Sequence, residues 1–271
     1  MSTTIGFLGA GQLGEPMVLR LLGAGHEVLV YSRREDARHR LQERGAALAD
    51  SIAGLASESD VLISCLFSDA QLRETGLGPG GFVVNAKPGA VFVSHTTGTV
   101  ATLEALRGPG AVILDAPVSG TVDDITAGTL TVLIGGPDDA VADVTPILSS
   151  YADPVVPTGA LGSALAIKLI NNLLFTANAQ LLAAAAQLGT RLGVEPDVLL
   201  STLQVCSGVS QAAAHAHRIG GLDRFEELAG PFLRKDVGAC RTAAAEADVD
   251  LGLLGLAVRD GPMALDQEGN P

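Results

Sequence analysis

Two scarcities in the sequence limit what the protein can be. The 271 residues include only three cysteines, and no two of them have metal-ligand spacing, so no metal ion is predicted. Their odd, low number indicates a reduced, cytoplasmic setting. Basic residues are also scarce: 17 Lys and Arg against 30 Asp and Glu give a formal net charge of −13. This charge argues against nucleic acid or an anionic membrane surface as a partner, and leaves a small molecule open.

Signals for export and membrane insertion are weak as well. The first residues, MSTTIGFLGAGQLG, enter a strand pattern directly, without a basic segment before an apolar run, so no signal peptide is expected. Leu169 to Thr190 carries no charge and is long enough to cross a bilayer. It contains five side-chain amides, however, and amides in hydrocarbon need partners. We therefore favour a helix packed between protein surfaces over a membrane span.

Lysine occurs only at positions 87, 168 and 235, so it is not used here as a general solubilising residue. Lys168 lies with Asn171 and Asn172 in an apolar segment, LGSALAIKLINNLLFTANAQLLAAAAQLG, that otherwise indicates a buried helix. Spacings of three and four residues place all three side chains on one helix face. This face is either a polar pocket or a helix edge from which the lysine extends to solvent.

The order of strand and helix patterns predicts the architecture. Continuous apolar strands alternate with helices in the first half, which is typical of an α/β fold with a parallel, doubly wound sheet. From about Gly159 the pattern is helical, so we predict two domains, 1–158 and 159–271, joined by a long helix from Gly162 to Gly193. The expected strands are Thr4–Leu8, Val28–Tyr31, Val61–Leu66, Val91–Ser94, Val112–Leu114, Leu130–Ile134 and one near Pro154–Val156, and the other expected helices are Gly11–Leu22, Arg34–Arg44, Ala70–Glu74, Val100–Leu106, Asp138–Leu148, Pro196–Cys206, Gln211–Arg218 and Phe232–Ala247.

A glycine motif follows the first predicted strand. The stretch Gly9-Ala10-Gly11-Gln12-Leu13-Gly14 fits G-x-G-x-x-G between a strand and a helix, the context of a dinucleotide-binding turn. In such a turn the first glycine permits the tight bend, the second admits a pyrophosphate, and the third lets the helix pack on the sheet. N–H groups at the helix N-terminus then face the phosphates.

About twenty residues further on, the residues differ from those of an NAD-binding chain. Ser32, Arg33 and Arg34 stand where an acid usually binds the ribose hydroxyls. Because forked guanidinium donors match the oxygens of a 2′-phosphate, we favour NADP over NAD. Two alternatives remain open: Glu35 is the missing acid, or Ser32 to Glu35 form a capping box at a solvated helix start.

Four segments together resemble a known family. GFLGAGQLGEPM, DAPVSGTVDDITAGTLTVLIGG, GSALAIKLINN and PFLRKD occur in the order seen in β-hydroxyacid dehydrogenases, and the chain resembles the 3-hydroxyisobutyrate dehydrogenase-like group over roughly residues 4 to 255. The resemblance implies an N-terminal Rossmann domain, like the NADP-binding domain of 6-phosphogluconate dehydrogenase, and an all-helical domain through which subunits form a homodimer or homotetramer. It also implies NADP-dependent hydride transfer between nicotinamide and a small β-hydroxy acid or the corresponding carbonyl.

The resemblance implies roles for single residues. Lys168 would be the catalytic acid/base, while Asn172, supported by Asn171, would orient the substrate. Lys235 of the KD motif would reach the cofactor or the substrate. Two further groups complete the site: Ser119, Gly120 and Thr121 at the substrate carboxylate, and Leu66, Phe67, Thr96 and Thr97 beside the cofactor, where ordinary packing is the alternative for Phe67 and the threonines.

Some residues depart from the family pattern. Thr121 replaces a usual glycine and would narrow the carboxylate cradle, and the nearby Asp123 and Asp124 would disfavour an anion unless they point to solvent, as we expect. His95 is expected to be a polar neighbour and not a base.

Two other functions remain open. Reduction of an imine is one, although many imine reductases carry Asp or Tyr where this chain has Lys168. A non-catalytic cofactor-binding protein is the other, although Lys168, Asn172 and Lys235 are all retained.

Overall fold

A computed structural model describes residues 3–108 and 111–265. The chain forms two compact units, Met1–Lys168 and Leu169–Pro271. The division falls inside the long helix α9 (Ser163–Arg191), whereas the change from strands to helices lies earlier, where strand β9 ends at Gly159. The first turns of α9 therefore belong to the first unit, and Lys168 is the last residue of that unit.

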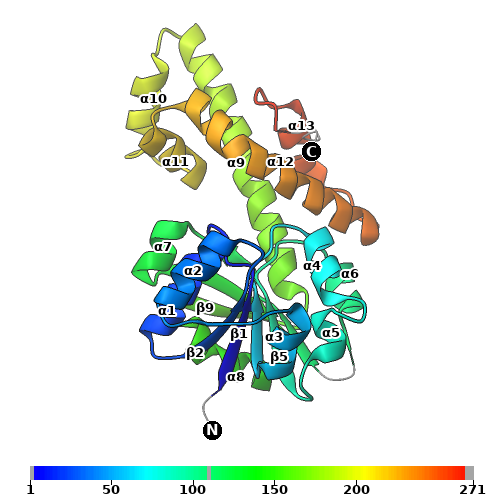
Figure 1. The fold of residues 1–271 in the computed structure, drawn as a ribbon. Coiled ribbons are helices and arrows are strands. Elements are labelled where there is room, and N and C mark those ends of the chain that lie inside the picture. The colour runs from blue at the N-terminus through cyan, green and yellow to red at the C-terminus, as the bar shows by residue number, and fades with distance from the viewer. Residues whose placement is uncertain (1–2, 109–110, 266–271) are drawn as a thin grey trace. The chain divides into compact units, whose positions relative to one another are not determined.

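The first unit is built on a nine-stranded sheet of order β3-β2-β1-β4-β5-β6-β8-β7, with β9 paired to β8 (Figure 1). Its first six strands pair in parallel, which confirms the predicted doubly wound α/β arrangement. Their bounds are Thr4–Leu8 (β1), Glu27–Tyr31 (β2), Ala47–Leu48 (β3), Val61–Ser64 (β4), Ala90–Ser94 (β5) and Ala111–Asp115 (β6).

The last three strands depart from the all-parallel pattern. They are β7 (Val118–Ser119), β8 (Leu130–Gly135) and β9 (Ala152–Gly159). Strand β8 pairs antiparallel with both β6 and β7, and parallel with β9. Between β7 and β8 lies only the short helix α7 (Val122–Ala127), so the chain returns directly beside β7 as in an antiparallel connection.

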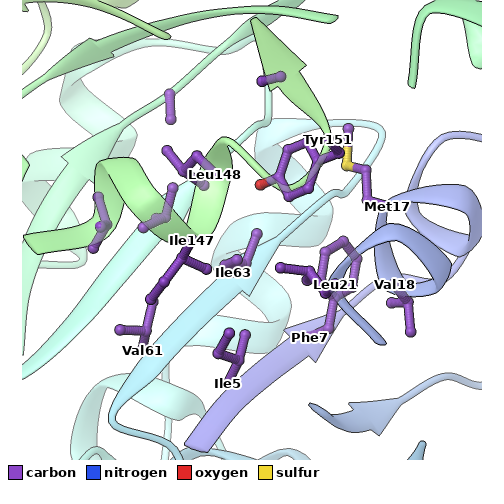
Figure 2. Close-up of a cluster of buried hydrophobic side chains, with 14 of the residues drawn as sticks. Ile5, Phe7, Met17, Val18, Leu21, Val61, Ile63, Ile147, Leu148 and Tyr151 are labelled. Atoms are coloured by element: carbon purple, nitrogen blue, oxygen red, sulfur yellow. The ribbon is translucent and has the colours of Figure 1, made fainter. Parts of the chain in front are cut away.

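Helices cover both faces of the sheet, which explains why its central strands are continuously apolar. One face packs against α1 (Gly14–Gly23), α2 (Glu35–Glu43), α7 and α8 (Asp138–Leu148), and Figure 2 shows the part of this core around Phe7, Met17 and Leu21. The opposite face packs against α3 (Ile52–Glu58), α4 (Asp69–Gly76), α5 (Phe82–Asn85), α6 (Val100–Ala105) and Leu165 of α9.

The second unit continues α9 and adds α10 (Pro196–Leu203), α11 (Gln211–Ile219), α12 (Leu222–Glu246) and α13 (Gly252–Asp260). The prediction that α12 begins at Phe232 was wrong. The helix starts at Leu222 and passes through Pro231, which lies exposed on its surface. Proline usually interrupts a helix because it lacks an N–H group and crowds the preceding turn, so the sequence indicated a boundary that packing overrides.

Helix α9 is long and apolar enough to cross a membrane, but the core helices of other proteins often are as well. Of its most apolar 18 residues, 56% are buried within the protein. In the second unit, Leu169 and Leu173 pack against Val237 of α12 and Val258 of α13. The buried Gln180 donates to the carbonyls of Val258 (3.0 Å) and Met263 (2.8 Å) and accepts from Met263 N–H (2.8 Å). These contacts are those of a helix between protein surfaces, where amides find partners.

A polar pair lies within the core of the first unit. The His95 ring bonds the Ala116 carbonyl through Nδ1 and the Tyr151 hydroxyl through Nε2 (2.8 Å). A carbonyl only accepts, so Nδ1 carries the proton and Nε2 accepts from the tyrosine. Burial lowers the pKa of His95 to about 4. The hydrogen bond to the Ala116 carbonyl raises this pKa, but by less than burial lowers it. Both ring nitrogens are engaged, so His95 is a polar neighbour of the strand ends and not a base.

This pair predicts an acid-sensitive stability. The unfolded chain binds a proton at His95 more readily than the folded chain does, so the free energy of unfolding is highest above about pH 6.5 and falls as pH drops toward 4. A pKa depression of this size corresponds to about 3 kcal/mol at most. Denaturant unfolding between pH 7 and 5 measures this decline in the free energy of unfolding. His95→Gln makes the decline smaller, whereas His39→Gln, which removes an exposed imidazole, leaves the decline unchanged. An equal decline in the His95→Gln protein would contradict the assignment.

Candidate active site

The predicted site residues of the first unit gather at one edge of the sheet. Leu8, Ser64, Ser94 and Asp115 are register neighbours across β1, β4, β5 and β6, and each is the last residue of its strand. The segments that follow these strands therefore leave the sheet at the same level. In parallel α/β sheets this carboxyl edge is where ligands bind.

The glycine turn after β1 has the geometry that a dinucleotide requires. Gly9 has a φ of +99°, and a Cβ there would lie 2.5 Å from the Cys65 carbonyl oxygen. A Cβ on Gly14 would lie 2.1 Å from the Gly9 carbonyl oxygen. At Gly11, by contrast, a Cβ would meet nothing within 4 Å, and no side chain caps the N-terminus of α1. Protein packing thus explains two of the glycines, and open space for a phosphate explains the third.

The other two residues of the motif differ in their surroundings. Gln12 is exposed, while Leu13 is half-buried and packs against the core beneath α1. Both lie at the start of α1, where Leu13 occupies the N-cap position.

The segment after β2 carries a network of exposed ion pairs. Arg34 bonds Asp36 through two nitrogens, and Arg40 binds Glu15 of α1 through Nε (2.7 Å) and a terminal nitrogen (2.8 Å). Arg40 also donates to Asp36 (3.0 Å), so one carboxylate joins two guanidiniums. The hydrogen bonds from Arg34 and Arg40 hold the pKa of Asp36 well below its usual range. Arg33 is exposed beside this network.

The capping box of Ser32 to Glu35, which the sequence left open as an alternative, does not form. The N-cap of α2 is Arg34, which makes no side-chain cap bond, and the Ser32 hydroxyl instead accepts from Arg34 N–H (3.2 Å). Ser32 is thereby buried two residues before the helix, at 8% exposure. Arg33 and Arg34 follow it with exposed side chains.

The segments after β4 and β5 carry an exposed apolar side chain and a buried hydroxyl, respectively. Phe67 is 61% exposed, which is unusual for a large apolar side chain, and Leu66 is half-buried next to it. Thr96 is 2% exposed, and its hydroxyl has no hydrogen-bond partner among the described residues, while Thr97 is half-buried. A buried hydroxyl without a partner is costly, so this strand end is suited to a polar ligand group.

The segment DAPVSG leads from β6 into β7 and a turn. Ser119 ends β7, and Gly120 has a φ of +141° that favours glycine. The Asp124 carboxylate accepts from both the Thr121 N–H (2.6 Å) and the Thr121 hydroxyl (2.8 Å), and Asp123 is exposed. Asp124 therefore turns back onto Thr121, whose two donors it occupies. The Ser119 hydroxyl stands as the strongest side-chain candidate for a substrate carboxylate.

The polar face of α9 is present as the spacing predicted. Lys168 is half-buried, Asn172 is 8% exposed, and Asn171 donates to Asn172 Oδ1 (3.0 Å). Asn172 donates in turn to Asp236 Oδ2 of α12 (2.8 Å). Because the amide nitrogen of Asn172 points to a carboxylate, its oxygen is directed away from Asp236, and the amide orientation is fixed.

The three lysines have different surroundings. Lys235 lies on α12 in the second unit, with Nζ 3.7 Å from the Asp236 carboxylate. Lys87 binds Asp60 (2.7 Å), which also accepts from Thr4 N–H, so it lies where β1, β4 and β5 begin and not at the site edge. Sequence reasoning assigned no role to Asp236, although the KD motif contains it.

The described residues fit a nucleotide cofactor and offer no metal site. Among them no group of three or more His, Cys, Asp and Glu side chains could hold a metal ion. The turn from Gly9 to Gly14, the exposed Arg33 and Arg34, and the buried Thr96 hydroxyl are arranged along one sheet edge. These features suit, in that order, a pyrophosphate, a ribose phosphate and a polar ring substituent.

Comparisons with known proteins agree with this geometry. Residues 4–166 match the family model described as the NAD binding domain of 6-phosphogluconate dehydrogenase, and residues 162–269 match the NAD-binding domain of NADP-dependent 3-hydroxyisobutyrate dehydrogenase. Human mitochondrial 3-hydroxyisobutyrate dehydrogenase is 33% identical over 210 residues, which cover 76% of this chain but only 62% of the human protein. The 2-(hydroxymethyl)glutarate dehydrogenase of Eubacterium barkeri is 30% identical over 95% of this chain and 88% of its own length.

A solved structure shows the same arrangement of elements. Mycobacterium tuberculosis 3-hydroxyisobutyrate dehydrogenase with L-serine superposes with a TM-score of 0.84 at 27% identity. The match covers 96% of this chain and 92% of the mycobacterial chain.

The glycine turn predicts two different consequences of adding a methyl group. Gly11→Ala meets no protein atom and leaves the unfolding transition unchanged, but it raises the Kd for NADPH about tenfold or more because the methyl group occupies the phosphate space. Gly14→Ala collides with the Gly9 carbonyl and lowers the unfolding temperature. Thermal unfolding without nucleotide and fluorescence titration with NADPH separate the two effects. Unchanged NADPH affinity in Gly11→Ala would contradict the assignment of this space.

Proposed function

The chain belongs to the β-hydroxyacid dehydrogenase family, in its 3-hydroxyisobutyrate dehydrogenase-like group, and from this membership we propose that it is an NADP(H)-dependent oxidoreductase. It transfers hydride between nicotinamide and a small β-hydroxy acid or the corresponding carbonyl. The observation that carries the proposal is the half-buried Lys168 on a helix face with Asn171 and Asn172. The names of the relatives supply the substrate class, a hydroxy acid with a short carbon chain.

The chemistry divides between the cofactor and the chain. The bound nicotinamide supplies the hydride acceptor for oxidation and the donor for reduction. Lys168 takes the hydroxyl proton as the carbinol is oxidised and returns it to the oxygen during reduction. Asn172, whose amide is oriented by Asp236 and Asn171, lies one helical turn after Lys168 on α9 and offers a polar group to the substrate there. Ser119 receives the substrate carboxylate at the sheet edge, and Leu66 and Phe67 offer an apolar surface to the ring.

The preference for NADP is supported by the arginines after β2. Arg33 and Arg34 are exposed at the position of the ribose, and their donors suit a 2′-phosphate. The acid that would bind the ribose hydroxyls of NAD is replaced there by Ser32, whose hydroxyl already accepts from Arg34 N–H. Asp36, two residues after Arg34, is the next acid after Glu35, but its carboxylate already accepts hydrogen bonds from Arg34 and Arg40.

Association through the helical region is supported by α9. Its exposed apolar side chains recur every three, four or seven residues and therefore form one stripe along the helix. They are Ile167, Ile170, Leu174, Leu181 and Leu188, each more than 40% exposed. We propose a homodimer or homotetramer in which a second copy covers this stripe. Sedimentation equilibrium at micromolar concentration tests it, and a monomer would contradict it.

Reduction of an imine is the second candidate. It is favoured by Thr121 and Asp124, which bond to each other at the turn where the family pattern leaves space for a substrate carboxylate. The lysine at position 168 favours the hydroxy acid. Assaying a panel of β-hydroxy acids and cyclic imines with the same enzyme preparation separates the two functions.

Replacement of the lysine tests the central claim. Lys168→Ala lowers kcat by about 10²- to 10⁴-fold because the proton transfer loses its partner. The Kd for NADPH stays within about twofold of the original value, since the proposal assigns nucleotide binding to the glycine turn and the two arginines and not to Lys168. Steady-state kinetics with 3-hydroxyisobutyrate, 2-(hydroxymethyl)glutarate and L-serine measure the loss. Lys87→Ala, at the opposite sheet edge, is the matched control and keeps kcat. Equal turnover of both variants would remove the acid/base assignment.

Replacement of the arginines tests cofactor preference. In the double variant Arg33→Ala, Arg34→Ala, the Kd for NADPH rises about tenfold or more, while the Kd for NADH changes little because NADH lacks the 2′-phosphate. Fluorescence titration with each nucleotide measures the ratio. Arg107→Ala, which removes a guanidinium paired with Glu104 on α6, serves as control and leaves both affinities unchanged. Equal losses for both nucleotides would refute the 2′-phosphate site.

A further inference from the structure

Asp115, the last residue of β6, connects the sheet to the start of α9. Its side chain is fully buried. One carboxylate oxygen accepts from Gly162 N–H (2.8 Å) and the other from Leu165 N–H (2.8 Å), across 47 and 50 residues of chain. A buried carboxylate is tolerated when donors of this kind satisfy it, and the positive end of a helix favours its charge. Asp115 thus caps α9 from a distant part of the sequence.

The two ends of this connection lead directly to proposed site residues. Asp115 opens the segment DAPVSG, in which Ser119 lies four positions later. On the helix, Lys168 lies three positions after Leu165, which is less than one turn. Next to Asp115, Ala116 N–H donates to the Ser94 carbonyl (2.7 Å), and the Ala116 carbonyl is bound by His95. The strand side of the connection is therefore held as firmly as the helix side.

The Asp115 carboxylate lies against the backbone of Gly135. Gly135 of β8 is the register partner of Asp115. A Cβ on Gly135 would lie 2.6 Å from Asp115 Oδ1, 2.8 Å from the Ala160 carbonyl oxygen and 2.8 Å from Ser163 Oγ. The absence of a side chain at position 135 is thus a condition for the Asp115 contacts.

We propose that Asp115 is a positioning residue for the reaction. Its carboxylate fixes the first turn of α9, and with it Lys168, relative to the β6–β7 segment that carries Ser119. This inference rests on the proposed function, because it gives Asp115 its role through Lys168. A misplacement of about 1 Å between reacting groups can lower a rate about 100-fold, so the geometry that Asp115 sets is expected to appear in kcat.

Two variants disturb this connection in different ways, and a third is the matched control. Asp115→Asn keeps one acceptor oxygen but turns an NH₂ group toward the other N–H donor. Gly135→Ala keeps the carboxylate but displaces it, because the added Cβ would lie 2.6 Å from Asp115 Oδ1. Thr158→Val removes a different tie at the same helix start, since the Thr158 hydroxyl bonds Ser163 Oγ (2.7 Å) and the Ile134 carbonyl (3.0 Å) without touching Asp115.

The first readout does not depend on activity. Hydrogen exchange measured by mass spectrometry follows the amides of residues 160–168 in the full chain. Asp115→Asn accelerates exchange at one of Gly162 and Leu165 about tenfold or more, because one N–H group loses its acceptor, and Gly135→Ala accelerates exchange at these amides because its methyl group displaces the carboxylate. Thr158→Val leaves exchange at these two amides unchanged. Protection that persists in Asp115→Asn would overturn the proposal.

The second readout separates positioning from folding. Turnover of 3-hydroxyisobutyrate, 2-(hydroxymethyl)glutarate and L-serine is normalised to the number of NADPH-binding sites, so unfolded protein does not count. In Asp115→Asn and Gly135→Ala, kcat per site falls about 100-fold while KM and the Kd for NADPH stay within about twofold, because binding groups remain in place. Thr158→Val keeps kcat per site. A loss of binding sites at unchanged kcat per site shows a structural role only and overturns the proposal.

Lys168→Ala, assayed in parallel, identifies which claim has failed. If Lys168→Ala also turns over normally, or if the original enzyme turns over none of the three acids, the proposed function is wrong and Asp115 loses its role with it. If Lys168→Ala is inactive while both Asp115→Asn and Gly135→Ala keep kcat per site, only the positioning role is wrong.

Discussion

Parallel pairing in register is the constraint on which the rest of the first unit depends. Because β1, β4, β5 and β6 end at the same level, four separate stretches of chain leave the sheet together. Each stretch then supplies one element of the proposed site: a glycine turn, an exposed Phe67, a buried Thr96 hydroxyl and the segment ending at Ser119. A shift of one residue in any pairing would turn buried apolar side chains toward the wrong helical layer. The core that fixes the register therefore also fixes the order of groups along the site edge.

The elements that the sequence predicted well are those whose local pattern and packing agree. Strands such as Thr4–Leu8 are short apolar runs between turns, and their bounds match the pattern. The reversal at β8 was not predicted, because side-chain alternation carries no information on strand direction. The predicted start of α12 was too late because a proline such as Pro231 normally interrupts a helix. In the structure Pro231 lies on the exposed side of the helix, and the buried face, which includes Leu233, continues past it. Local preference is a weak guide where an amphipathic face is already anchored by packing.

The contacts that support the candidate site were not predicted from the sequence. The face of α9 with Lys168 and its two asparagines follows from helical spacing alone, because the partners lie within five residues. Asp236, which orients Asn172, stands 64 residues away, and a single sequence does not show that two such positions meet. The same holds for Asp115 and α9. Conversely, Ser32 and Glu35 have the spacing of a capping box, yet the helix begins later and the serine serves a turn. Spacing defines which contacts are possible, and the fold selects among them.

The net charge of −13 and an anionic cofactor are compatible because charge is distributed unevenly. After β2, guanidiniums of Arg34 and Arg40 share the Asp36 carboxylate, so the positive charge is balanced within a few residues when no nucleotide is present. All three side chains are about half exposed, and exposed ion pairs contribute little because both charges remain hydrated. A phosphate with two or three free oxygens offers Arg34 the same bidentate contact with a larger charge. In the proposed NADP complex, exchange of Asp36 for a phosphate would therefore be a small change for the protein, and an acidic chain would keep its arginines paired when no nucleotide is bound.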